Sequence, residues 1–260
     1  MTYQNVLPNN KLGKTRFLNG NSELKKHIPE TAPETKEDLY EFLQRYKTVY
    51  VKPNHGTGGH GVMRVKRTSD EGYEYQLGEK VYAFPTYEEM YHSLYRITSK
   101  RRHLVQKGIR LLKYRGRPFD VRIMVQKNLK GEWENTGIIG RVAHPNKIVT
   151  NYHSGGTPLA MHTLLKPYLT GKQIDEYLVH LNRLGREIAE YLVKGYPFVT
   201  AVGVDVGLDS KFKPWIIEVN TRPDPYIFKK LKDKSVFRRI IRYVKAHRKA
   251  SRFSEAAGGS

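Results

Sequence analysis

The 260-residue sequence predicts an α+β fold, and three local patterns carry that prediction. Two strands rich in β-branched residues, at 48–52 and 62–66, flank a glycine-rich turn and indicate an antiparallel hairpin. A second strand pair is expected at 201–206 and 215–219, around a turn-rich connection. Residues 173–193 carry apolar side chains at three- and four-residue spacings, which is the pattern of a core helix.

The N-terminal elements follow from turn and capping signals. The polar, glycine-containing stretch at residues 9–21 is expected to lie over the surface, and residues 29–33 form an extended lead. This lead enters a helix capped near Thr35, whose apolar face consists of Leu39, Phe42 and Leu43.

Further along, the sequence predicts a helix at residues 87–98 and three strands, at 104–109, 121–126 and 136–142. Residues 150–158 form a polar loop that contains glycine. A last helix begins near Lys229 and is expected to bury Phe237, Ile241 and Val244 while its basic residues face solvent.

The composition is that of a folded protein, with 38% hydrophobic, 11% aromatic and 27% charged residues. The absence of cysteine excludes a disulfide framework, thiolate metal sites and cysteine nucleophiles. No apolar run approaches the roughly 20 residues of a membrane span, and residues 1–10 lack the apolar core of a signal peptide. We therefore expect a soluble, cytoplasmic chain that is not exported through a cleaved signal.

The net charge of +21 is concentrated in two stretches. Residues 96–117 hold nine basic residues and no acid, and residues 229–252 hold eleven basic residues and one acid. Such fields attract nucleotides, acidic peptides, nucleic acid or membrane surfaces, and a simple solvated face has the same composition. Charge alone selects no function.

A glycine-dense loop after the first strand is the first candidate site. Gly56, Gly58, Gly59 and Gly61 let backbone N–H groups approach a bound anion, which suggests a phosphate cradle. The loop is not a Walker motif, because no Gly-Lys-Ser/Thr follows, and it is not a dinucleotide-binding motif, because it joins two strands and does not open a helix. The alternative to a phosphate cradle is a mobile surface turn. Lys52, at the strand end before the loop, supplies a point charge suited to phosphate oxygens.

The second candidate site combines Asp205, Glu218 and Asn220. Strand alternation sends Ile216, Glu218 and Asn220 to one face, and pairing of Asp205 with Glu218 would bring their Cβ atoms to about 5 Å. Two carboxylates and an amide are oxygen ligands suited to Mg²⁺ bound together with nucleotide phosphates. Acids on a solvated face are the alternative.

Two arginines next to apolar strand residues, Arg122 and Arg141, carry guanidinium groups suited to phosphate or carboxylate oxygens. Each could instead belong to a structural ion pair, with Asp120 as the expected partner of Arg122. Asn151 precedes a Gly-Gly-Thr segment at 155–157, which forms another loop with exposed backbone donors.

Taken in order, these parts resemble the ATP-grasp family over residues 46–228. The resemblance is closest to the spore-coat-associated ATP-grasp proteins of the YheC/YheD type. It rests on His-Ile-Pro-Glu-Thr at 27–31, Tyr-Val-Lys-Pro at 50–53, Phe-Asp-Val-Arg at 119–122 and Glu-Val-Asn-Thr-Arg-Pro at 218–223. A chain of this type would sandwich ATP between two α+β subdomains.

The resemblance also implies a role for each candidate residue. Lys52 and the glycine loop would contact the triphosphate, Asn151 would also bind ATP, and Asp205, Glu218 and Asn220 would hold Mg²⁺. Arg122 and Arg141, together with Lys52, would stabilise the transferring phosphoryl group and the acyl phosphate. The adenine would be framed by the backbone of Gln106, Lys107, Gly108 and Ile109.

The same resemblance divides the chain into four parts. A polar lead with a short helix spans 1–45, and a subdomain with the glycine lid and the adenine-binding strand spans 46–115. A C-terminal subdomain with the magnesium site spans 116–228, and a basic helix and tail span 229–260. The full-size domain that precedes the grasp region in typical relatives is missing, so a protein partner or a second copy is expected to complete the substrate site.

The implied activity is an ATP- and Mg²⁺-dependent ligase that phosphorylates a carboxylate, acidic or peptide-like, and joins it to an amine or similar nucleophile. Two alternatives stay open: a kinase of the same fold that phosphorylates a hydroxyl, and a non-catalytic basic scaffold protein of the spore coat. Nucleic-acid binding is disfavoured because the sequence has no helix-turn-helix and no aromatic-studded single-strand motif. The resemblance adds spore association to the cytoplasmic location expected above.

Overall fold

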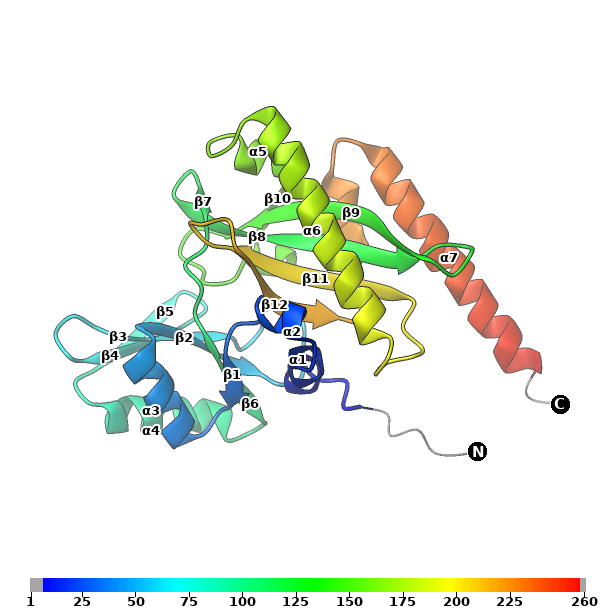
Figure 1. The fold of residues 1–260 in the computed structure, drawn as a ribbon. Coiled ribbons are helices and arrows are strands. Elements are labelled where there is room, and N and C mark those ends of the chain that lie inside the picture. Colours follow the sequence, from blue (N-terminus) through cyan, green and yellow to red (C-terminus); the bar gives the residue numbers. More distant parts are fainter. Residues whose placement is uncertain (1–6, 258–260) are drawn as a thin grey trace.

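Two six-stranded antiparallel arrangements, each with its own helices, make up the computed structural model of the chain (Figure 1). The structure describes residues 7–257. Residues 1–6 of the polar start and 258–260 of the basic tail lie outside the described part. Within that part, no helix is both long and apolar enough to cross a membrane.

The first sheet has the strand order β1-β6-β2-β3-β4-β5. Helices α3 (Lys36–Arg45) and α4 (Tyr87–Thr98) pack against it. The predicted hairpin around the glycine loop is confirmed as β2 paired with β3, and the Thr35 cap with its three buried apolar residues is confirmed as well. The strands are β1 (Thr31–Pro33), β2 (Thr48–Pro53), β3 (Met63–Arg67), β4 (Tyr73–Leu77), β5 (Lys80–Phe84) and β6 (His103–Lys107).

The second sheet has the order β10-β9-β8-β11-β12, with the short strand β7 paired to β8. Between its strands lie α5 (Met161–Leu165), α6 (Gly171–Leu192) and the 3₁₀ turn η1 (Tyr152–Ser154). After it come the turn η2 (Tyr226–Lys230) and α7 (Lys234–Ala257). The strands are β7 (Lys113–Tyr114), β8 (Arg117–Lys127), β9 (Trp133–Val142), β10 (Thr157–Leu159), β11 (Ala201–Leu208) and β12 (Pro214–Asn220).

Helices α6 and α7 cover opposite faces of this second sheet. Alternate side chains of β8 point toward the two helices: Ile123 and Val125 belong to the core under α6, whereas Met124 packs with Ile240 of α7. The sequence placed Phe237, Ile241 and Val244 on the buried face of α7, and of these Phe237 and Val244 pack against the cluster that contains Met124 and Ile240. These three are half-buried, while Ile240 and Tyr243 are buried.

The N-terminal stretch does not lie loosely over the surface, which corrects the expectation for residues 9–21. It forms helices α1 (Lys11–Asn19) and α2 (Ser22–Lys25), and Asn10 caps α1 by accepting a hydrogen bond from Gly13 N. Leu18 and Leu24, 1% and 2% exposed, insert into the core of the second sheet. Helix α1 therefore packs beside α6 and β12 as part of the domain (Figure 1).

The antiparallel pairing of β11 with β12 is confirmed, and Asp205 lies directly opposite Glu218. A register shift follows, so that Val206 pairs with Ile216 and Ile217 is left without a cross-strand partner. Ile216 and Val219 consequently enter the α6 core, whereas Ile217 and Glu218 face the space between the two sheets. The expected shared face of Ile216, Glu218 and Asn220 is wrong for Ile216 because of this bulge.

Candidate nucleotide site

A cleft with about 820 Å³ of empty space lies between the two sheets. Its walls come from β2, β6 and the glycine loop on one side, from β8, β9, β11 and β12 on the other, and from the first residue of α1. Ten sequence-predicted residues line it: Lys52, Gly56, Gly59, Gln106, Lys107, Ile109, Arg141, Asn151, Asp205 and Glu218.

An outer cavity of about 790 Å³ of empty space continues from this cleft and shares Arg141, Asn151, Asp205 and Glu218 with it. Three further predicted residues, Gly58, Arg122 and Asn220, line this outer cavity. Its remaining walls include Tyr152 of η1, Arg222 after β12 and Ile227 of η2.

Lys52 is buried in the cleft wall, with 8% of the residue exposed. Its Nζ donates a hydrogen bond to Gln106 Oε1 at 2.6 Å, and Gln106 Nε2 in turn donates to Thr31 Oγ1 at 3.1 Å. Burial lowers the pKa of Lys52 from 10.5 to about 8, against the opposing influence of Glu218. At pH 7 the lysine is still protonated, and it is a poorly solvated cation that an anionic ligand would stabilise.

The glycine loop takes backbone conformations that favour glycine. The φ angles of Gly56, Gly58, Gly59 and Gly61 are +117°, +72°, +77° and +71°. The loop also lies close against the loop that contains Asn151. A Cβ atom on Gly59 would lie 2.7 Å from Asn151 Oδ1, and Ser154 Oγ donates to the Gly58 carbonyl at 2.9 Å. The glycine loop therefore borders the cleft and contacts the loop between β9 and β10.

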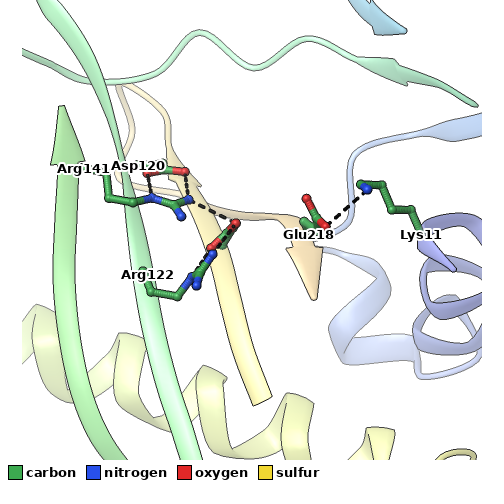
Figure 2. A network of polar contacts seen from close by, with 6 residues as sticks. Lys11, Asp120, Arg122, Arg141 and Glu218 are labelled. Carbon is green, nitrogen blue, oxygen red and sulfur yellow. Dashed lines mark hydrogen bonds and ion pairs between the residues drawn. The ribbon is translucent and has the colours of Figure 1, made fainter. Parts of the chain in front are cut away.

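Two buried arginine–aspartate pairs form the floor of the site, and Figure 2 shows the contacts between them. Arg141 Nε donates to Asp120 Oδ1 at 2.8 Å, and its Nη2 lies 3.1 Å from Asp205 Oδ2. Arg122 donates to Asp205 through Nε and Nη2. The expected pairing of Arg122 with Asp120 is wrong because the sheet register sets Arg122 opposite Asp205 and Asp120 opposite Arg141.

These pairs fix the charge states of the floor. Burial alone would raise the pKa of Asp205, but Arg122 and Arg141 outweigh it and lower that pKa. Burial alone would lower the pKa of Arg141, and Asp120 and Asp205 together raise it instead. Asp205 therefore stays a carboxylate and Arg141 a guanidinium under any ordinary condition.

The predicted magnesium ligands border a single space. Asp205 and Glu218 are cross-strand neighbours, Asn220 lies opposite Gly203 on the same pair of strands, and all three line the outer cavity. Their oxygens are the hard donors that Mg²⁺ prefers, so the set fits the metal. Among residues 7–257, no three His, Cys, Asp or Glu side chains gather at metal-binding distance. A magnesium site at Asp205 and Glu218 would therefore need the amide oxygen of Asn220 and the phosphates of a ligand as further ligands.

Two predicted residues do not line either cavity. Gly108 donates its backbone N–H to the Thr48 carbonyl, and a Cβ there would lie 2.6 Å from that oxygen. A Cβ on Gly61 would lie 2.6 Å from Arg101 Nη2. Both glycines therefore allow close packing around the cleft. The apolar side chains in the cleft wall include Ile109, Leu111, Ile148 and Ile217.

Lys11 is the main site residue that the sequence did not reveal. Its Nζ donates to the Gly56 carbonyl at 2.6 Å and lies 3.5 Å from Glu218 Oε1 (Figure 2). It thus links the glycine loop to a predicted metal ligand. The available signal was Asn10 directly before Lys11, an N-cap residue type, which the surrounding asparagines and glycines obscured.

Three solved structures of enzymes or enzyme domains have a similar fold. The biotin carboxylase domain of 2-oxoglutarate carboxylase from Hydrogenobacter thermophilus, solved with MgADP, ADP and bicarbonate, aligns with a TM-score of 0.52 and 17% identity over 90% of this chain and 45% of that one. N5-carboxyaminoimidazole ribonucleotide synthetase bound to ADP aligns with a TM-score of 0.51 and 13% identity, over 90% and 50%. The C-terminal domain of K. lactis Pby1, described as an ATP-grasp enzyme that interacts with a decapping enzyme, aligns with a TM-score of 0.50 and 15% identity, over 92% and 71%. These likenesses establish the fold.

Two curated proteins of Bacillus subtilis (strain 168) are similar in sequence. Endospore coat-associated protein YheD is 29% identical over 74% of this chain and 43% of its own length. Endospore coat-associated protein YheC is 23% identical over 79% of this chain and 57% of its own length. The chain thus spans about half the length of these relatives. A family model described as YheC/D-like ATP-grasp matches residues 2–247, nearly the whole sequence. The chain therefore belongs to the YheC/D-like ATP-grasp family.

Proposed function

We propose that the chain is an ATP- and Mg²⁺-dependent ligase that activates a carboxylate as an acyl phosphate and joins it to an amine or similar nucleophile. One observation carries this proposal. A single cleft brings together a buried lysine, a glycine loop, a buried arginine and a carboxylate pair from strands that are far apart in the sequence. The shared fold of two enzymes solved with ADP adds support.

In this proposal the adenine lies against the apolar wall of Ile109, Leu111 and Ile217, beside Gln106 and Lys107. The triphosphate lies under the glycine loop, where backbone N–H groups, Lys52 and Lys11 meet its negative charge. The close contact of Gly59 with Asn151 makes this loop a lid that excludes water from the phosphates.

The chemistry has two steps. A carboxylate oxygen of the substrate forms a bond to the γ-phosphorus while the bond from that phosphorus to the β–γ bridging oxygen breaks, and ADP leaves. The nucleophile's nitrogen then forms a bond to the acyl carbon, the carbon–oxygen bond to phosphate breaks, and the nitrogen releases its proton. Such transfers depend on positioning and charge neutralisation more than on a covalent side chain.

The residues of this chain supply that neutralisation. Arg122 and Arg141 border the outer cavity, where the carboxylate would meet the γ-phosphate. Both are held in place by buried aspartates, so their guanidinium groups are preorganised for a developing charge. Asp205, Glu218 and Asn220 would hold Mg²⁺, which when bound neutralises phosphate charge.

The test is chemical trapping. The protein is incubated with ATP, Mg²⁺, hydroxylamine and pools of amino acids and acidic peptides, and ADP and hydroxamate are measured. We expect ADP and hydroxamate in equal amounts, because hydroxylamine intercepts an acyl phosphate. Glu218→Gln should abolish both products, and Glu190→Gln, an exposed glutamate of α6, should leave both unchanged. A phosphorylated hydroxyl without hydroxamate would identify a kinase instead and refute the proposal.

A further inference from the structure

A stripe of basic residues runs along the solvent face of α7. Lys234, Arg238, Arg242, Lys245 and Lys249 follow one another at spacings of four, four, three and four residues, and all five are exposed. These spacings place them on one side of the helix. From Lys234 to Lys249 the helix has no acidic residue. The five cations therefore form a single row along the helix.

The opposite side of α7 holds the helix on the sheet. Ile240 and Tyr243 are buried, Tyr243 donates its hydroxyl hydrogen to Glu134 Oε2 at 2.7 Å, and Arg239 Nη2 donates to the Thr136 carbonyl at 3.0 Å. The imidazole Nε2 of His247 lies 2.7 Å from the Lys127 carbonyl. The basic stripe is thus presented by a helix that is anchored beside β8 and β9 between Arg239 and His247, and the C-terminal turns of α7 extend beyond the sheet (Figure 1).

The stripe begins next to η2, which borders the outer cavity. Lys234 Nζ donates to the carbonyls of Lys229 and Leu231, each at 2.8 Å, and so joins the start of α7 to the end of η2. Ile227 of η2 lines the outer cavity, and Lys230 Nζ lies 5.7 Å from the ring centre of Tyr152, another lining residue. A chain that leaves the cavity past Tyr152 would meet Lys230 first and then the stripe.

We propose that the carboxylate substrate belongs to an acidic polypeptide, which lies along the α7 stripe and places one carboxyl group in the outer cavity. This inference rests on the proposed function, because the cavity is taken to be the place where the carboxylate is activated. The stripe from Lys234 to Lys249 is about 22 Å long at 1.5 Å per residue. An extended peptide of about seven residues spans that length.

An acidic polypeptide fits both parts of this surface, whereas other polyanions fit only one. Nucleic acid and other polyphosphates would pair with the stripe but offer no carboxyl group to the arginines of the outer cavity. A single amino acid would fill the cavity but make no use of the stripe. Glutamate-rich peptides supply regularly spaced carboxylates for the stripe and a carboxyl group to be activated.

The first experiment measures binding without nucleotide. Fluorescein-labelled octaglutamate is titrated by fluorescence anisotropy against the wild-type chain, the variant R238Q/R242Q/K245Q and a matched control, R96Q/R102Q/K113Q. The control removes three exposed cations of the same types from elsewhere on the surface. We expect the stripe variant to bind about tenfold more weakly, since each exposed ion pair contributes modestly, and the control to change less than twofold.

The second experiment measures ADP release with Mg·ATP and glutamate peptides of two, four, eight and twelve residues. We expect the KM to fall with length up to about eight residues and then to level off, and the stripe variant to raise the KM for octaglutamate about tenfold. Equal effects of the two triple variants, or a KM independent of length, would overturn the inference. Stripe-dependent binding of a single-stranded DNA that outcompetes octaglutamate would overturn it in favour of nucleic acid.

The two proposals fail in different ways. If Mg·ATP does not bind in calorimetry, the proposed function fails, whatever the peptide does. If Mg·ATP binds and small carboxylates release ADP, but octaglutamate shows no stripe-dependent binding, only the substrate assignment fails. Stripe-dependent binding of octaglutamate without ADP release would refute its role as the substrate.

Discussion

The buried ammonium of Lys52 makes ATP binding sensitive to pH. Its pKa of about 8 in the free protein rises when phosphates bind, because they stabilise the charged form. ATP affinity should therefore be constant below pH 8 and fall above it, by up to tenfold per pH unit, as binding must take up a proton. Calorimetry with ATP at pH 7, 8 and 9 measures this change.

The matched control is Lys52→Arg, which keeps its charge at every pH used. Its ATP affinity should show no loss between pH 8 and pH 9. An equal loss in the wild type and in this variant would show that another group titrates and that Lys52 does not meet the phosphates.

Asp205 should matter for folding as well as for function, because it is buried between two arginines. Replacement by Ala leaves the buried guanidinium of Arg122 without its partner and removes one of the two carboxylates that pair with Arg141, so we expect a loss of about 3–5 kcal/mol in the free energy of unfolding. Asp175→Ala, at an exposed aspartate paired with His162, should cost about 0.5 kcal/mol or less. Urea denaturation of both variants compares the two losses, and equal losses would contradict the buried network.

At the scale of single residues, strand alternation and pairing sufficed to predict that Asp205 faces Glu218. They did not suffice for Arg122, because its partner depends on the register between β8 and β11, which one sequence does not encode locally. Lys11 was missed for a similar reason. Its role depends on where α1 docks, and this is set by the distant contacts of Leu18 and Leu24.

Among the elements, the glycine loop gives the sharpest test of a lid. Gly59→Ala adds a Cβ 2.7 Å from Asn151 Oδ1 at a φ of +77°, so it should push the loop away from the second subdomain. We expect ATP to bind at least tenfold more weakly. Gly78→Ala has a similar φ of +63° but nothing within 4 Å of the new Cβ, so it should leave ATP affinity unchanged. Equal affinities of the two variants would exclude the lid contact.

Helix α1 should behave as part of the core. Leu18→Ala removes a side chain that is 1% exposed, and we expect it to lower the free energy of unfolding by about 2–5 kcal/mol. Val179→Ala, at a residue of α6 that is 62% exposed, should change it by less than about 0.5 kcal/mol. Similar small losses for both substitutions in urea denaturation would contradict the packing of α1 in the core and would support a loose surface segment, as the sequence suggested.

At the scale of elements, long periodic segments were predictable and short or mixed ones were not. Residues 87–98 and the helix α6 follow clear three- and four-residue apolar spacings. In α7, by contrast, apolar and basic residues alternate so closely that the two most buried residues, Ile240 and Tyr243, were not predicted. Strands β4 and β5 were missed, although their sequences, Tyr-Glu-Tyr-Gln-Leu and Lys-Val-Tyr-Ala-Phe, contain the aromatic and β-branched residues typical of strands.

For the whole molecule, the cleft depends on two sheets facing each other, with α1 closing one side. The α+β class and the ATP-grasp fold were both predicted from the order of the motifs, and both are confirmed. The position of α1 was not predicted, because α1 packs against β12, which lies some 200 residues later in the chain. The magnesium site and the roles of the individual residues stay predictions.

The central claim is that this cleft binds Mg·ATP, and calorimetry tests it most directly. ATP is titrated into the wild-type chain with Mg²⁺ and with EDTA, and then into Glu218→Gln under both conditions. We predict tight binding that weakens at least tenfold without Mg²⁺ in the wild type, and a much smaller effect of Mg²⁺ in the variant. No ATP binding, or a dependence on Mg²⁺ that Glu218→Gln leaves unaltered, would contradict the assignment of this cleft.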